Sequence, residues 1–128
     1  MGGFKFKNRY LVCQITFKDG RGLSSTPSVV LKALRDSLGE LFGDVGRGAS
    51  LASCQIKYVH DPSGIFLIRC GRDMYRDVWL ALTCIKSIEM RLCRCDVLRC
   101  SGSLSSSLAG LQEEVGVDIS SSLAHIVE

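Results

Sequence analysis

Three arginines follow one another where the sequence would change from a strand into a helix. The stretch GIFLIRCGRDMY, residues 64–75, begins with an apolar run typical of a buried strand, and Arg69 stands at the end of that run. Arg72 and Arg76 come just beyond it. A planar guanidinium can give two hydrogen bonds to one phosphate, and free backbone N–H groups at a helix start attract anions. This spacing favours a phosphate-binding site at the junction.

A second group of cations, Lys5, Lys7 and Arg9, lies around the start of the first predicted strand and could form a basic arm that contacts nucleic acid. A purely structural explanation also fits the junction. Asp73 and Asp77 lie among its arginines, and Asp73 could pair with Arg76 one turn along the helix. The residues alone therefore leave two interpretations open, a phosphate site and a set of solvated ion pairs.

Charge is distributed unevenly along the 128 residues, although the net charge is only +3. Residues 1–102 carry all 16 Lys and Arg and nine of the 13 acids, whereas residues 103–128 carry the other four acids. The basic part suits a polyanion such as nucleic acid, although scattered surface charge gives the same total. We expect one domain, with a basic body over 1–102 and a serine-containing acidic helical extension over 103–128.

Motifs of the common enzyme classes are absent: the sequence has no glycine-rich phosphate loop, no zinc-protease motif and no serine-hydrolase motif. The seven cysteines form an odd set without a C-x-x-C pair, and His60 and His125 are far from them in sequence. The start MGGFKFKNRY lacks the apolar core of a secretory signal, which favours the cytosol or nucleus and free thiols. We therefore expect no catalysis by the chain itself, no cofactor and no metal. A redox or metal-handling domain built on Cys93, Cys95 and Cys100 is a weaker alternative.

The spacing of apolar residues predicts the elements that would position these cations. Strands are expected over residues 8–17, 51–60, 65–70 and 91–100, and helices over 27–42, from about 75 to 85, and over 104–115, with a short fourth helix beyond 119. Gly43, Gly46 and Gly48 are expected to end the first helix. Trp79 is expected to lie in the core.

This order indicates an α+β domain, because two strand–helix–strand units joined by a hairpin form a ferredoxin-like, four-stranded antiparallel sheet with two helices packed on it. RNA-recognition-motif domains share this plan, with extra C-terminal helices expected here. The opposite face of the sheet would remain available to a ligand or partner. Base stacking on the sheet is not predicted, because Phe66 is the one aromatic residue of the central strand.

Several segments together carry a resemblance to a known family: FKNRYLV (6–12), SLASCQIKYV (50–59), IRCGRDMYRDVWLALTCIKSI (68–88) and VLRCSG (97–102). The sequence resembles the Pop-five subunits of nuclear ribonuclease P and RNase MRP, and looks closest to plant-type members. The matching positions are Lys7 with Arg9-Tyr10, Lys57-Tyr58, Arg69-Cys70, residues 78–82 and Ser101-Gly102. The chain departs from the family pattern at Ser105, where the family usually carries a basic residue.

The resemblance implies a non-catalytic RNA-binding subunit of a ribonucleoprotein that removes the 5′ leader from precursor tRNA or processes rRNA, with cleavage performed by RNA. It also implies a TIM-barrel-like protein partner and a location in the nucleus, especially the nucleolus. A protein-only interaction module with the same fold is the alternative. The residues that we expect to contact RNA phosphates are Lys5, Lys7, Arg9, Lys57, Arg69, Arg72, Arg76 and Arg99.

Overall fold

The structure is a computed structural model that describes residues 7–22 and 27–126, so Lys5 lies outside the described residues. Within these ranges the chain alternates strands and helices in the order expected for an α+β domain. None of the described helices combines the length and the apolar composition that a bilayer crossing requires. The elements are β1 (Asn8–Phe17), α1 (Pro27–Ala52), β2 (Gln55–His60), β3 (Ile65–Gly71), α2 (Tyr75–Thr83), β4 (Ser87–Ile88), β5 (Arg91–Ser101), α3 (Leu104–Val115) and α4 (Ser120–Leu123).

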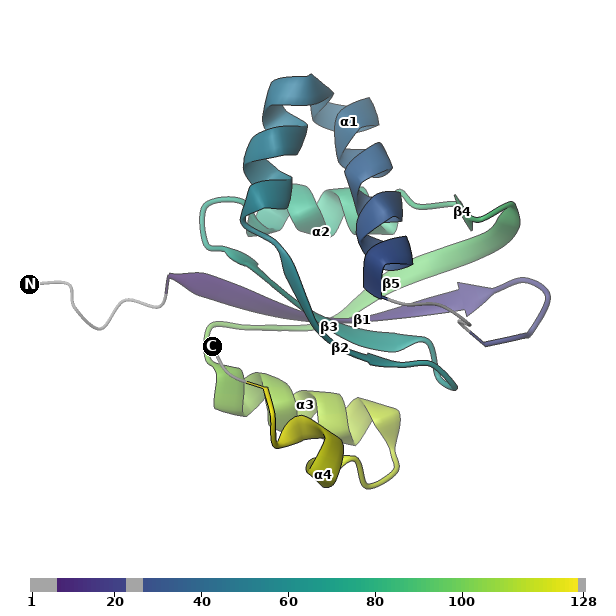
Figure 1. Cartoon of the computed structure of the whole chain (residues 1–128), viewed down its shortest axis with the longest axis vertical. Helices are drawn as coiled ribbons and strands as arrows, with labels where there is room; N and C mark the ends of the chain where they lie inside the picture. The colour runs from purple at the N-terminus through teal and green to yellow at the C-terminus, as the bar shows by residue number, and fades with distance from the viewer. Residues whose placement is uncertain (1–6, 23–26, 127–128) are drawn as a thin grey trace, which may run out of the picture.

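The strands form one antiparallel sheet in the order β2-β3-β1-β5-β4 (Figure 1). β1 lies at its centre, because it pairs with β3 along one edge and with β5 along the other. The α+β prediction is confirmed. The sheet has five strands where four were expected, because Ser87–Ile88 pairs with the start of β5 as a short additional strand.

The main core lies between one face of the sheet and the helices α1 and α2 (Figure 1). Alternation along β1 sends Leu11, Cys13, Ile15 and Phe17 into this core, as the sequence pattern predicts. From the helices, the buried side chains include Val30, Leu34, Leu38, Val78, Ala81 and Leu82.

A second core covers the other face of the sheet, where α3 and α4 lie (Figure 1). Tyr10 and Leu67 from the strands are fully buried against Leu111 of α3, and Leu123 of α4 packs with them. The expectation of an open sheet face is therefore wrong. The apolar residues of the serine-containing extension are removed from water when they pack on this face, and this burial is favourable.

The helix α1 continues beyond the end that the glycines predict. Gly43 has φ 74° and ψ −177°, which interrupts the helical backbone, and the chain then resumes as helix as far as Ala52. Figure 1 shows the two limbs of α1 side by side, joined at the tip. Gly46 and Gly48 lie within the second limb, so β2 begins at Gln55 and not at residue 51.

The prediction that Trp79 lies in the core is also wrong, because this residue is 37% exposed. Ala81 is buried on the inner side of α2 instead. There the hydroxyl of Ser37 in α1 donates a hydrogen bond to the backbone oxygen of Ala81 over 2.6 Å. The close approach of the two helices favours a small residue at this point.

Candidate nucleic-acid interface

The predicted cations of the described chain gather at one end of the sheet. Antiparallel pairing places Asn8, at the start of β1, opposite Gly71 at the end of β3, and Tyr10 opposite Ser101 at the end of β5. The same end holds the start of β2 and of α2, at the left of Figure 1. We call this region the arginine end and define it by Lys7, Arg9, Lys57, Arg69, Arg72, Arg76 and Arg99.

Strand alternation divides the arginine end between the two faces of the sheet. Arg9 stands opposite Cys70, which is buried in the core beneath α1 and α2. Arg69 stands opposite Tyr10, which is buried beneath α3 and α4. Successive residues of a strand point to opposite faces. The structure therefore does not bring Arg69 to the start of α2 with Arg72 and Arg76, as a single phosphate site at the junction would require.

On the face of α2, two arginines contact the ring of Tyr75. The Cζ atoms of Arg9 and Arg76 lie 5.6 Å and 5.7 Å from the ring centroid, within the range of cation–π attraction. Nε of Arg76 also donates to the Tyr75 hydroxyl over 3.3 Å, and this hydrogen bond raises the pKa of Arg76. Nη1 of Arg9 donates to the backbone oxygen of Asn8 over 3.0 Å. Sequence reasoning missed the contact of Arg9 with Tyr75, which joins segments far apart in the chain.

The turn that precedes α2 is held by backbone hydrogen bonds. The N–H of Arg72 donates to the oxygen of Lys7 over 2.9 Å, and that of Met74 donates to Gly71 over 3.0 Å. Met74, in the N-cap position, gives the helix no side-chain cap. The proposed pairing of Asp73 with Arg76 is not formed, since Asp73 lies 3.9 Å from Nε of Arg72 instead. Both partners are exposed, so this ion pair adds little stability.

Arg69, on the face of α3, and Lys57 of β2 form a second group of cations. Both residues are half-buried, and Gln55, two residues before Lys57, pairs with Arg69 across the strands. Burial and the charge of Arg69 lower the pKa of Lys57. The Arg69 side chain makes no hydrogen bond or ion pair with the described residues. Two neighbouring cations with this arrangement would be stabilised by an anion.

Arg99 lies on the same face but has carboxylate partners in α3. Its Nη2 lies 3.3 Å from Glu113 and its Nε lies 3.2 Å from Glu114. The arginine stem packs closely on Gly110, where a Cβ atom would come within 2.7 Å of the Arg99 Cδ. Arg99 thus contacts the acidic extension through both an ion-pair group and close packing on Gly110. Its expected contact with RNA stays a prediction.

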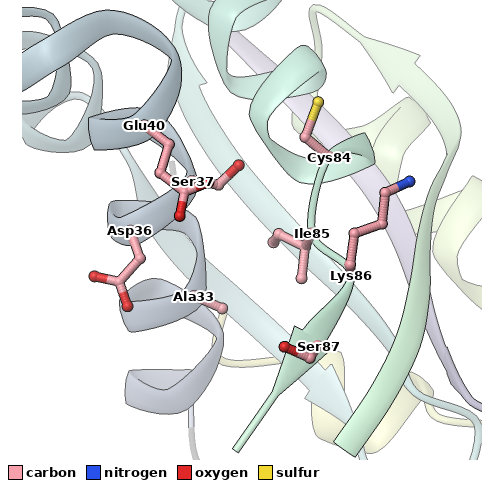
Figure 2. Close-up of a pocket in the computed structure, with 8 residues that line it drawn as sticks. All are labelled: Ala33, Asp36, Ser37, Glu40, Cys84, Ile85, Lys86 and Ser87. Atoms are coloured by element: carbon pink, nitrogen blue, oxygen red, sulfur yellow. The ribbon is translucent and has the colours of Figure 1, made fainter. Parts of the chain in front are cut away.

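A cavity of about 290 Å³ between α1 and the segment after α2 is the other polar site of interest. Figure 2 shows Asp36 and Glu40 on one wall, with Cys84 and Lys86 opposite. Neither histidine lines it, so Cys84 has no imidazole base there. Over residues 7–22 and 27–126, no group of three or more His, Cys, Asp or Glu side chains could hold a metal ion.

The thiol alternative finds similarly little support in the described chain. Burial raises the pKa of Cys95 to about 12, and that of Cys93 is raised for the same reason. A thiol with a raised pKa stays protonated at neutral pH, and the thiolate is the reactive form. Cys95 therefore acts as a small buried hydrophobic residue.

Comparisons with known proteins identify the family of this chain. The model of the Rpp14/Pop5 family matches residues 9–109. The probable ribonuclease P/MRP protein subunit POP5 of Arabidopsis thaliana is 34% identical over 116 residues, covering 74% of this chain and 77% of the relative. The Homo sapiens ribonuclease P/MRP protein subunit POP5 is 35% identical over 86 residues, covering 66% of this chain. The chain spans about half the length of the mammalian relatives it matches, 51% of the Bos taurus subunit and 53% of the human one.

The fold also has a counterpart among solved structures. A chain of the cryo-EM structure of yeast ribonuclease MRP superposes with a TM-score of 0.59 and 16% sequence identity, covering 88% of this chain and 93% of that chain. At this identity the likeness concerns the fold. It extends across both cores, because so large a share of the two chains is aligned.

Proposed function

Because this chain belongs to the Rpp14/Pop5 family, we propose that it is an accessory protein subunit of a ribonuclease P or RNase MRP ribonucleoprotein and binds RNA through its arginine end. In this role it supports removal of the 5′ leader from precursor tRNA and the processing of rRNA. Cleavage is assigned to the RNA of the particle, and the protein holds RNA in place. The proposed location is the nucleus, with the nucleolus as the compartment.

The observation that carries RNA binding is the half-buried cation pair Lys57 and Arg69. Surface arginines that only improve solubility are normally exposed, or paired with carboxylates as Arg94 is with Asp96. Arg69 has no such partner among the described residues, and Lys57 brings a second positive charge close to it. An RNA phosphate would neutralise Arg69 and would be attracted by the nearby charge of Lys57.

Contact with the phosphate backbone is proposed in place of base stacking. The strand order β2-β3-β1-β5, with α1 after β1 and α2 after β3, supports the ferredoxin-like plan that RNA-recognition-motif domains share. Those domains stack bases on an open sheet face. Here α3 and α4 cover that face, so the arginine end at the sheet margin is the proposed RNA contact instead.

A protein neighbour is proposed for the tip of α1. Leu41, Phe42 and Val45 are exposed there, and Val45 is 89% exposed. Clustered exposed apolar side chains typically mark a protein contact. The TIM-barrel-like subunit of the same particle is the proposed occupant, which makes the α1 tip a protein contact and the arginine end an RNA contact.

Affinity purification of the tagged full chain, followed by sequencing of the bound RNA, tests the proposed function. Ribonuclease P or MRP RNA should copurify, and the double variant Lys57→Ala with Arg69→Ala should retain less of it. Arg94→Ala, which removes an exposed cation near the other end of the sheet, is the matched control. Protein partners retained after nuclease treatment, with no crosslinking of the chain to RNA, would support the protein-only module instead.

A further inference from the structure

Tyr75 joins two cations that come from different elements of the fold. Arg9 belongs to β1 and Arg76 to α2, and both guanidinium carbons lie within 6 Å of the same ring, at 5.6 Å and 5.7 Å from its centroid. The ring itself is half-buried and packs against the main core. It therefore has a fixed position, set by the core and not by the surface.

The ring helps the two arginines to hold fixed positions beside it. Long side chains lose rotamer freedom when they are ordered, and two positive charges repel each other. The electron-rich face of a tyrosine ring attracts each guanidinium and offsets part of both costs. The hydrogen bond from Arg76 to the Tyr75 hydroxyl fixes the second guanidinium further.

The arrangement also leaves the charge of Arg76 without a carboxylate. No described Asp or Glu lies within ion-pair distance of this residue, although Asp73 and Asp77 are its neighbours in sequence. A guanidinium that stacks on a ring still directs its N–H groups outward in its own plane, where a phosphate can accept two of them.

We propose that Tyr75 is a positioning residue that holds Arg9 and Arg76 as one phosphate-binding pair. The inference rests on the proposed function, because it specifies how one part of the arginine end contacts RNA. The ring serves the two cations and is not a platform for a base. The contact is therefore with the sugar–phosphate backbone and is independent of base sequence.

The test is a titration of the full chain with a generic RNA hairpin at several KCl concentrations. Each phosphate contact contributes about one unit to the slope of log affinity against log salt. Arg9→Ala and Arg76→Ala should each lower the slope by about one. Tyr75→Leu should lower it by about one and weaken binding about tenfold or more, although it removes no charge. Tyr75→Phe keeps the ring and should retain most of the wild-type slope.

A double-mutant cycle separates positioning from simple loss of packing. With Tyr75 in place, the effects of Arg9→Ala and Arg76→Ala should be coupled. In the Tyr75→Leu background, either arginine substitution should change the affinity less than twofold further. The Arg69→Ala effect should be the same in both backgrounds, because Arg69 lies on the other face of the sheet.

A wild-type slope for a folded Tyr75→Leu variant would overturn the proposal. If this variant does not fold, independent and additive effects of Arg9→Ala and Arg76→Ala in the chain with Tyr75 would overturn it equally. The proposed function fails by a different result, namely the absence of ribonuclease P or MRP RNA from the purified particle. The two failures are distinguishable because the hairpin carries no sequence of either RNA.

Discussion

Arg9 and Arg69 lie on paired strands one residue out of register, and their side chains leave opposite faces of the sheet. Arg9 pairs with Cys70, while Arg69 pairs with Tyr10. The strands β1 and β3 thus present one arginine toward α2 and one toward α3. The arginine end offers cations on both sides of the sheet margin.

This separation predicts that Arg9→Ala and Arg69→Ala weaken RNA binding additively. Residues that share no partner usually contribute independently, within about 0.3–0.5 kcal/mol. Titration of the two single variants and the double variant with an RNA hairpin measures the coupling. A coupling well above that range would mean that one phosphate contacts both arginines. The pair Arg9 and Arg76 serves as the comparison, because both contact Tyr75.

The stability of the fold should depend on Asp19 in acid. Its carboxylate accepts hydrogen bonds from Arg91 over 2.9 Å and 2.8 Å, and these lower the pKa of Asp19 from 3.8 to about 2. The ionised form is favoured in the folded state, so the stabilisation is present above pH 3.8 and is lost as the pH falls to about 2. In thermal unfolding, Asp19→Asn should have a lower melting temperature than wild type at pH 7. This difference in melting temperature should narrow from pH 4 to pH 2.

The control for this pH dependence is Asp44→Asn, which removes an exposed carboxylate on α1 and should leave the profile unchanged. A constant difference between Asp19→Asn and wild type from pH 7 to pH 2 would contradict the role of Asp19. The Arg91 guanidinium also lies 3.7 Å from the centroid of the Phe17 ring. The ion pair between Arg91 and Asp19 thus lies at the end of the sheet opposite to the arginine end.

The C-terminal helices should unfold together with the body. Leu111 of α3 is fully buried against the sheet, and truncation of such a residue costs roughly 2–5 kcal/mol. Leu111→Ala should therefore lower the free energy of unfolding by this amount, in one transition that includes β1. Leu92→Ala, at a residue that is 59% exposed, should change it by less than about 0.5 kcal/mol. A separate early transition for residues 103–126 would show that the extension is not part of the same domain.

Two glycines of α1 should respond to alanine in opposite directions. Gly43 has φ 74° and ψ −177°, a conformation nearly restricted to glycine, so Gly43→Ala should cost about 1–3 kcal/mol. Gly48 lies within the second limb, and the methyl group of an alanine there would meet open space, so Gly48→Ala should stabilise the chain by about 0.5–1 kcal/mol. Urea unfolding of both variants measures the two values. Equal effects would contradict the kink at Gly43.

Local patterns in the sequence predicted the elements well and their ends less well. The period-two pattern of β1 correctly identified Leu11, Cys13, Ile15 and Phe17 as one buried face. The end of α1 was misplaced, because a glycine that interrupts a helix can also reverse the chain, and only packing against other elements shows which occurs. The apolar spacing of residues 104–115 correctly predicted α3 but did not show that this helix covers the second face of the sheet.

The site was predicted as a set of residues but not as a geometry. In β3, Arg69 points to the same face of the sheet as Ile65 and Leu67, which lie in the second core. Strand alternation could therefore have shown that Arg69 does not point toward the start of α2. No local signal places Arg9 beside Tyr75, because that contact joins segments far apart in the sequence. Such contacts depend on strand pairing, which the spacing of residues does not specify.

Burial of the sheet on both faces has a thermodynamic consequence for binding. The segments that carry Arg9, Lys57 and Arg69 are held by strand pairing between two cores, so their backbone is already ordered before RNA arrives. Association then restricts mainly side chains, and the entropic penalty of forming the complex is small for a contact of this size. In the proposed RNA contact, preorganisation of the backbone would let a few guanidinium groups on a small domain suffice for binding.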